Sequence, residues 1–130
     1  MIGIDTNILL RLFQTEEHPR QTAAALRTIE EQGPVFVSPV VLVEFVWTLR
    51  RVFKLNRLHI YERLEGIVNS SEFVVAFPEA TRRAVELFGA GPADFPDYLL
   101  GELNLAHGCT ATLTFDRDAA RNSAFRHLPI

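Results

Sequence analysis

The sequence predicts an α/β fold in which helices cover both faces of a parallel sheet. Short runs rich in β-branched and aromatic residues recur along the chain, for example over residues 35–37 and 73–77. Segments with helical periodicity separate these runs, and proline or glycine marks most of the boundaries. Strands that alternate with helices are typical of parallel sheets buried on both sides. We therefore expect a three-layer α/β/α fold with a parallel sheet of about four to five strands.

Helix breakers and caps define the elements of the N-terminal half. Pro19 suits the first turn of a helix, and Gly33 suits its end. The residues of this helix that are expected to share one apolar face are Ala23, Leu26 and Ile29. The other elements expected in this half are strands over residues 1–5, 35–37 and 73–77 and helices over residues 8–13, 39–53 and 57–69.

The C-terminal half is expected to continue the alternation of helices and strands. Pro78 opens a helix that ends near Gly91, and Asp94 precedes a second helix that Gly108 ends. The remaining expected elements are a strand over residues 112–115, a short helical turn and an edge strand within residues 125–130. We find no internal repeat or linker, so residues 1–130 are expected to form a single domain.

Composition is that of an ordinary globular protein, with 48% hydrophobic and 22% charged residues. The formal net charge of −3 does not suit a protein held to nucleic acid by bulk charge. Cys109 is the only cysteine, which excludes an intramolecular disulfide and suits a reducing compartment. The longest apolar run, residues 40–47, is interrupted by Glu44 and is too short to span a bilayer. With no signal-peptide pattern at the N-terminus, we expect a cytoplasmic protein.

Two acidic residues follow predicted strands. Asp5 ends the first strand, and Asp116 ends the strand over residues 112–115. The carboxyl ends of parallel strands face one edge of a sheet, where ligands bind, so neighbouring strands would bring these carboxylates into one cleft. Each residue also has a structural explanation, since Asp5 can cap the following helix and Asp116 can form an Asx turn.

Glu44 is unusual because it interrupts an apolar helix. Its neighbours one turn away include Val40, Val41 and Trp47. We expect a carboxylate in such surroundings to be partly desolvated and to need a partner. The alternatives are an ion pair with a nearby arginine or a single solvent-facing position on the helix.

Asp94 and Asp97 form a third acidic group at the start of a helix. Asp94 suits the N-cap and Asp97 the first turn. Acids gathered at one sheet edge, without histidine or cysteine at metal-ligand spacing, favour a hard cation such as Mg²⁺ or Mn²⁺ over zinc. The sequence has no phosphate-binding glycine loop, which excludes the common nucleotide cradles. A phosphatase of the haloacid dehalogenase type needs a second acid two residues after the first. That position is Asn7 here, which argues against this class of enzyme.

Four motifs together resemble the PIN-domain ribonucleases, and most closely the VapC-type toxins of toxin–antitoxin pairs. They occur in the family's order and spacing over nearly the whole chain. The motifs are Asp5-Thr6-Asn7, Ser38-Pro39 with Glu44, Asp94-Phe95-Pro96-Asp97 and Thr114-Phe115-Asp116-Arg117-Asp118. The resemblance implies that Asp5, Glu44, Asp97 and Asp116 are the catalytic and metal-binding acids. It leaves Asp94 and Asp118 as additional acids, with Asn7, Ser38 and Thr114 as supporting polar residues.

The resemblance also implies an activity and partners. It implies endonucleolytic hydrolysis of RNA with bound Mg²⁺ or Mn²⁺, homodimers, and inhibition by a small antitoxin protein. A tRNA is one substrate that the resemblance suggests. The competing hypotheses are a stand-alone RNA-processing PIN nuclease and a non-catalytic RNA-binding PIN domain, because a fold does not fix a function. A non-catalytic domain would be expected to lose some of the acids, and this chain keeps all of them.

Overall fold

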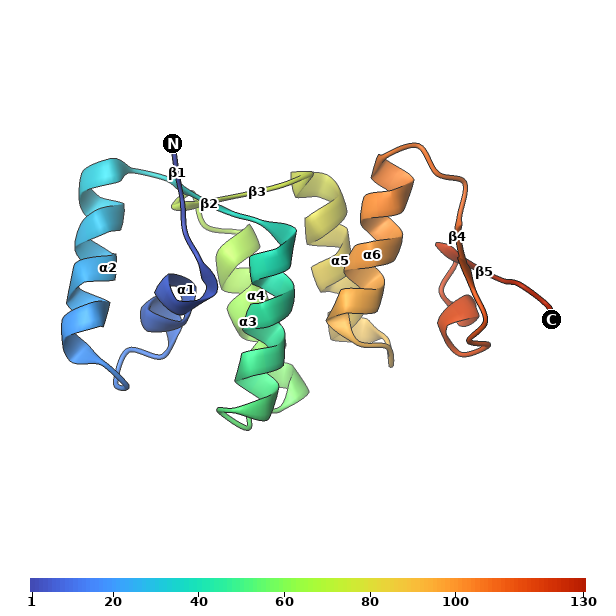
Figure 1. Ribbon diagram of the computed structural model, residues 1–130, viewed down its shortest axis with the longest axis horizontal. Coiled ribbons are helices and arrows are strands. Elements are labelled where there is room, and N and C mark those ends of the chain that lie inside the picture. The colour runs from blue at the N-terminus through green and yellow to red at the C-terminus, as the bar shows by residue number, and fades with distance from the viewer. The chain divides into compact units, whose positions relative to one another are not determined.

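The computed structural model describes residues 1–130, and its helices and strands alternate as the sequence predicts. The chain forms two compact units, Met1–Ala76 and Phe77–Ile130 (Figure 1). The expectation of a single domain stays a prediction.

The first unit contains a three-stranded parallel sheet with four helices. Its strands pair in the order β1-β2-β3, with Ile2 opposite Val35 and Val35 opposite Phe73. The central strand is the most buried, since Val35 and Val37 are inaccessible to solvent. The elements are β1 (Ile2–Gly3), α1 (Thr6–Phe13), α2 (Pro19–Gln32), β2 (Val35–Val37), α3 (Pro39–Arg51), α4 (Arg57–Val68) and β3 (Phe73–Val75).

An aromatic cluster joins the helices of the first unit to its sheet. Figure 1 shows α2 beside α1 and α4 beside α3. The ring of Phe13 at the end of α1 lies 5.6 Å from that of Phe45 on α3 and 6.1 Å from that of Phe73 on β3. The inward face predicted for α4 is confirmed, because its buried residues are Ile60, Leu64, Ile67 and Val68.

The face of α2 that packs inward differs from the prediction. Leu26 is 49% exposed and Ala23 is also exposed, whereas Thr22 and Ala25 are buried. The hydroxyl of Thr22 donates to the backbone carbonyls of Arg11 and Thr15, at 3.2 Å each. This polar contact turns the small residues of α2, and not its leucine, toward α1.

The second unit contains a pair of packed helices and a two-stranded parallel sheet. The rings of Phe88 and Phe95 meet edge to face, 6.0 Å apart, between α5 and α6. Asn104 donates a hydrogen bond of 2.8 Å to the hydroxyl of Thr112, which ties α6 to β4. The elements are α5 (Pro78–Ala90), α6 (Phe95–Ala106), β4 (Thr112–Thr114), a 3-10 turn (Ala119–Arg121) and β5 (Phe125–His127).

Every strand pairing is parallel, as predicted, but neither sheet reaches the four to five strands expected of a single sheet. The strands are distributed between a three-stranded sheet and a two-stranded sheet, one in each unit. No helix in the structure combines the length and the apolar character needed to cross a lipid bilayer.

Candidate metal centre

Asp5 occupies the turn between β1 and α1. Its Oδ1 accepts a hydrogen bond of 3.0 Å from the backbone amide of Ile8, and its backbone carbonyl accepts from Leu9. Asp5 is therefore the N-cap of α1. Since the cap uses Oδ1, Oδ2 of the exposed side chain is left without a hydrogen bond from the protein.

Glu44 lies on the exposed side of α3, so the expectation that it is desolvated is wrong. The buried face of this helix consists of Val41, Leu42, Phe45, Val46 and Leu49. The apolar neighbours that share the exposed side with Glu44 are themselves open to solvent, with Val40 67% and Trp47 57% exposed. In place of an ion pair, Oε1 of Glu44 accepts a hydrogen bond of 3.0 Å from the hydroxyl of Thr6.

Asp94 and Asp97 lie at the start of α6, as predicted. Asp94 is the N-cap and accepts a hydrogen bond of 2.8 Å from the amide of Phe95, and Asp97 is in the first turn. Partial burial raises the pKa of Asp97, and the negative charges of Asp94 and Asp116 raise it further. A cation bound beside these carboxylates would offset their repulsion.

Asp116 follows β4 in a hydrogen-bonded turn. Its Oδ1 accepts a hydrogen bond of 2.9 Å from the amide of Asp118, and its own amide donates to the hydroxyl of Thr114 at 3.0 Å. The side chain of Asp118 points to a different partner, since its carboxylate lies 3.6 Å from the guanidinium of Arg121, with both side chains strongly exposed. Thr114 thus fixes the turn that carries Asp116, whereas Asp118 contributes only its backbone.

The structure brings the candidate acids together in two groups. Asp5 and Glu44 belong to the first unit, where Thr6 follows Asp5 and donates to Glu44, while the charges of Asp94 and Asp116 act on Asp97 within the second. Within either unit, no three acidic, histidine or cysteine side chains lie close enough to hold a metal ion by themselves.

The other two supporting residues have structural positions. Ser38 is the N-cap of α3 and accepts from the amide of Val41 at 3.3 Å, so it fixes the start of the helix that carries Glu44. Asn7 is exposed in the first turn of α1, beside Thr6.

The donor chemistry of these residues fits a hard cation. In each of Asp5, Glu44 and Asp116, one carboxylate oxygen accepts a hydrogen bond and the second oxygen has no protein partner. The hydrogen bond orients the carboxylate, and the second oxygen is left for a ligand. All the candidate donors are oxygen atoms, as Mg²⁺ and Mn²⁺ prefer.

Thr6 is the residue that the sequence did not single out. A threonine at the start of a helix is usually explained by local hydrogen bonding to the backbone. Its bond to Glu44 spans 38 positions and depends on how α1 packs against α3. The signal in the sequence was its place beside Asp5, at the sheet edge where ligands bind.

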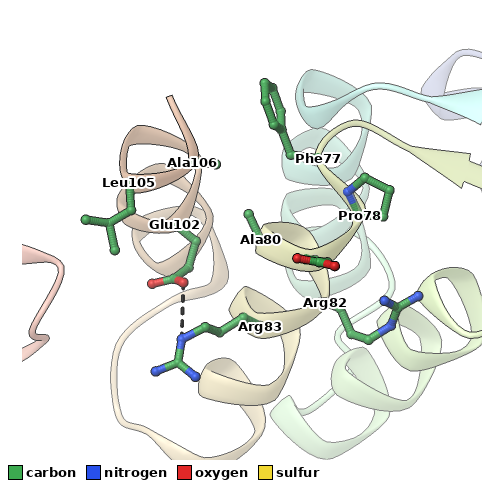
Figure 2. A pocket seen from close by; sticks show the side chains of 9 residues that line it. Phe77, Pro78, Ala80, Arg82, Arg83, Glu102, Leu105 and Ala106 are labelled. Atoms are coloured by element: carbon green, nitrogen blue, oxygen red, sulfur yellow. Dashed lines mark ion pairs between the residues drawn. The ribbon is translucent and has the colours of Figure 1, made fainter. Parts of the chain in front are cut away.

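A separate pocket of about 780 Å³ lies between α5 and α6 in the second unit (Figure 2). Phe77 and Leu105 supply much of its apolar wall, and Nε of Arg83 pairs with Oε1 of Glu102 at 3.2 Å. Phe77 is held in the left-handed region, with φ of 45°. None of the candidate acids lines this pocket.

Comparison with known proteins identifies the family. The sequence-family model named PIN domain matches residues 2–124 of the chain. The chain belongs to the PIN-domain family. Membership agrees with the resemblance seen in the four motifs and with the three-layer α/β class. This chain is also similar to a VapC ribonuclease of Aquifex aeolicus (strain VF5). The two are 28% identical over 116 residues, which cover 88% of this chain and 86% of the relative. No solved structure matches the chain.

Proposed function

We propose that this PIN domain is a metal-dependent endoribonuclease that hydrolyses RNA phosphodiester bonds. The observation that carries the proposal is the set of oriented carboxylates, each with one oxygen held and the other without a protein partner. The similarity to a VapC ribonuclease over most of both chains supports RNA as the substrate. The family match supports a nuclease on this fold.

The proposed ligands of the cation are carboxylates. Asp5, Glu44, Asp97 and Asp116 would hold Mg²⁺ or Mn²⁺, with Asp94 as an additional acid.

The proposed roles of the residues follow from their surroundings. A bound divalent cation supplies a nucleophilic water and neutralises charge on the phosphate. Thr114 and Ser38 hold the backbone that carries Asp116 and Glu44. Asp97 has a raised pKa, which suits a carboxylate that accepts a proton as a general base.

The finer biological assignment is the toxin of a type II toxin–antitoxin pair. We propose that a small antitoxin protein inhibits the nuclease, that the active form is a homodimer, and that the protein works in the cytoplasm. Single-stranded or loop RNA, including tRNA, is the proposed substrate class, because unpaired bases are accessible to protein side chains. The similarity to a VapC protein supports this assignment.

Cleavage of RNA by the purified protein tests the proposal. We expect cleavage in Mn²⁺ or Mg²⁺, none in excess chelator, and loss of activity in Asp5→Asn and Asp116→Asn with the fold retained by circular dichroism. Arg27→Gln is the matched control, because it removes an exposed positive charge from α2, which carries no candidate ligand.

Two results would change the assignment. RNA binding without cleavage by the parent protein would favour a non-catalytic RNA-binding PIN domain. Cleavage that no co-expressed small protein inhibits, and that does not slow cell growth, would favour a stand-alone RNA-processing nuclease.

A further inference from the structure

Thr6 and Glu44 form a side-chain contact that joins two elements of the first unit. Oγ1 of Thr6 donates a hydrogen bond of 3.0 Å to Oε1 of Glu44, from the first turn of α1 to α3. We propose that Thr6 is a positioning residue that aims the Glu44 carboxylate at the bound cation. This role rests on the proposed function, in which Glu44 is a metal ligand.

Glu44 needs such a partner because its own surroundings do not fix it. The side chain is exposed, its neighbours along the exposed side of α3 are Val40 and Trp47, and its hydrogen bond from the protein comes from Thr6. A glutamate in this setting samples many rotamers, and ordering it on ligand binding opposes affinity. The bond from Thr6 removes part of that freedom before the cation arrives.

Thr6 is well built to hold an acceptor. Threonine is β-branched, so its first side-chain torsion is restricted. Its backbone is also fixed, because the preceding residue, Asp5, caps α1 through the amide of Ile8. One turn of the chain therefore carries the candidate ligand Asp5 and also aims the candidate ligand Glu44. The bond uses Oε1 alone, which leaves Oε2 for the cation.

A purely structural role for the Thr6–Glu44 bond predicts a different outcome. The bond would then matter only because it links α1 to α3. Those helices are already joined by the contact of the Phe13 and Phe45 rings, and the Thr6–Glu44 bond lies at the exposed surface. Loss of an exposed hydrogen bond changes stability little, because water replaces the missing partner. Metal affinity should therefore change while the thermal unfolding temperature does not.

The test compares four proteins for Mn²⁺ binding by calorimetry and for RNA cleavage as a function of Mn²⁺ concentration. They are the parent, Thr6→Val, Thr6→Ser and the control Thr28→Val. Valine keeps the shape of threonine without the hydroxyl, and serine restores the donor. Thr28 is a suitable control because its hydroxyl donates at 3.0 Å to the carbonyl of Ala24 on α2, away from any candidate ligand.

We expect Thr6→Val to weaken Mn²⁺ binding by about tenfold, the lower end of the range for residues that orient a metal ligand. The Mn²⁺ concentration for half-maximal cleavage should rise by the same factor, and saturating Mn²⁺ should restore most of the rate. Thr6→Ser should stay within about threefold of the parent, and Thr28→Val should match it. In a Glu44→Ala background, Thr6→Val should have no further effect, because its target is gone.

The outcomes separate this role from the proposed function. A parent that binds Mn²⁺ and cleaves RNA, with a Thr6→Val variant that does both equally well, would overturn the role of Thr6 and leave the nuclease intact. An effect of Thr6→Val that persists in Glu44→Ala, or that comes with a lower unfolding temperature, would also overturn it. A parent that neither binds Mn²⁺ nor cleaves RNA would remove the proposed function, and the role of Thr6 with it.

Discussion

Asp5 accepts a hydrogen bond of 3.0 Å from the backbone amide of Ile8, so a candidate metal ligand is also the cap of a helix. The two roles use different atoms, because the cap occupies Oδ1 and a cation would bind Oδ2. A structural explanation of Asp5 and a functional one therefore do not exclude each other. The same holds for Asp116, whose Oδ1 accepts from the amide of Asp118.

The first prediction separates capping by Asp5 from metal binding. Asparagine caps helices as well as aspartate does, whereas alanine does not, at a loss of about 1 kcal/mol. We expect Asp5→Asn to unfold in urea at nearly the parent midpoint, and Asp5→Ala to be less stable by about that amount. Both variants should lose RNA cleavage. Substantial cleavage by Asp5→Asn would show that the charge of Asp5 is not needed for catalysis.

The second prediction concerns the raised pKa of Asp97 and its sign. Because of its partial burial and the charges of Asp94 and Asp116, the carboxyl of Asp97 binds its proton more tightly in the folded protein than in the unfolded chain. Stability therefore falls as the pH rises from the ordinary value of 3.8 through the raised pKa, and the loss is complete above it. We expect Asp97→Asn to raise the thermal unfolding temperature at neutral pH without divalent cations.

The gain in stability of Asp97→Asn should shrink as the pH is lowered through the raised pKa toward 3.8, because the folded parent takes up its proton over that range. Added Mn²⁺ should stabilise the parent more than the variant, because binding to the folded state raises stability by mass action. Glu86→Gln on the exposed side of α5 is the control for loss of one negative charge. An equal gain for Glu86→Gln would point to net charge as the cause, and not to the surroundings of Asp97.

The elements that the sequence predicted well are those with local causes. Side chains that accept from an amide three residues later start helices at Asp5, Ser38 and Asn56. Gly33, with φ of 79°, ends α2 where a side chain would be strained. The candidate acids were found for the same reason, because their places at strand ends and helix starts are local features of the chain.

The features that the sequence did not predict depend on packing between elements. Periodicity placed Leu26 on the inner face of α2. In the structure, the hydroxyl of Thr22 bonds to carbonyls of α1 and of the turn that follows it, so Thr22 faces inward and Leu26 faces the solvent. The apolar neighbours of Glu44 suggested burial, yet Val40 and Trp47 are exposed because other residues of α3 fill the core. Partners far apart in sequence, such as Thr6 and Glu44, have no local signal.

The third prediction tests the packing of α6 against β5. A Cβ atom added to Gly101 would lie 2.8 Å from the ring of Phe125 and 3.0 Å from Cβ of Ala124. Real Cβ atoms do not approach neighbours this closely, so the Phe125 ring or the backbone around it must shift. We expect Gly101→Ala to lower the free energy of unfolding by about 1–3 kcal/mol, the usual effect of overpacking.

Gly66→Ala is the matched control for Gly101→Ala. Gly66 also lies inside a helix, α4, but a Cβ atom there would be 3.4 Å from the ring of Phe13, an ordinary contact. Alanine is the better helix former, so Gly66→Ala should raise stability by about 0.5–1 kcal/mol. Urea unfolding of both variants measures the difference. Equal effects in the two helices would mean that Gly101 is not required for the approach of Phe125.

The fourth prediction uses Trp47, the only tryptophan in the chain, as a probe of the exposed side of α3. Its side chain is 57% exposed and lies one turn from Glu44. We expect the purified protein to show the red-shifted emission of a solvated indole and efficient quenching by acrylamide. The Leu49→Trp variant in a Trp47→Phe background is the contrast, because Leu49 is fully buried and its indole should be blue-shifted and protected. Blue-shifted, protected emission from Trp47 in the parent would show that this side of α3 is covered in solution, and a concentration dependence of that protection would identify a second copy of the chain as the cover.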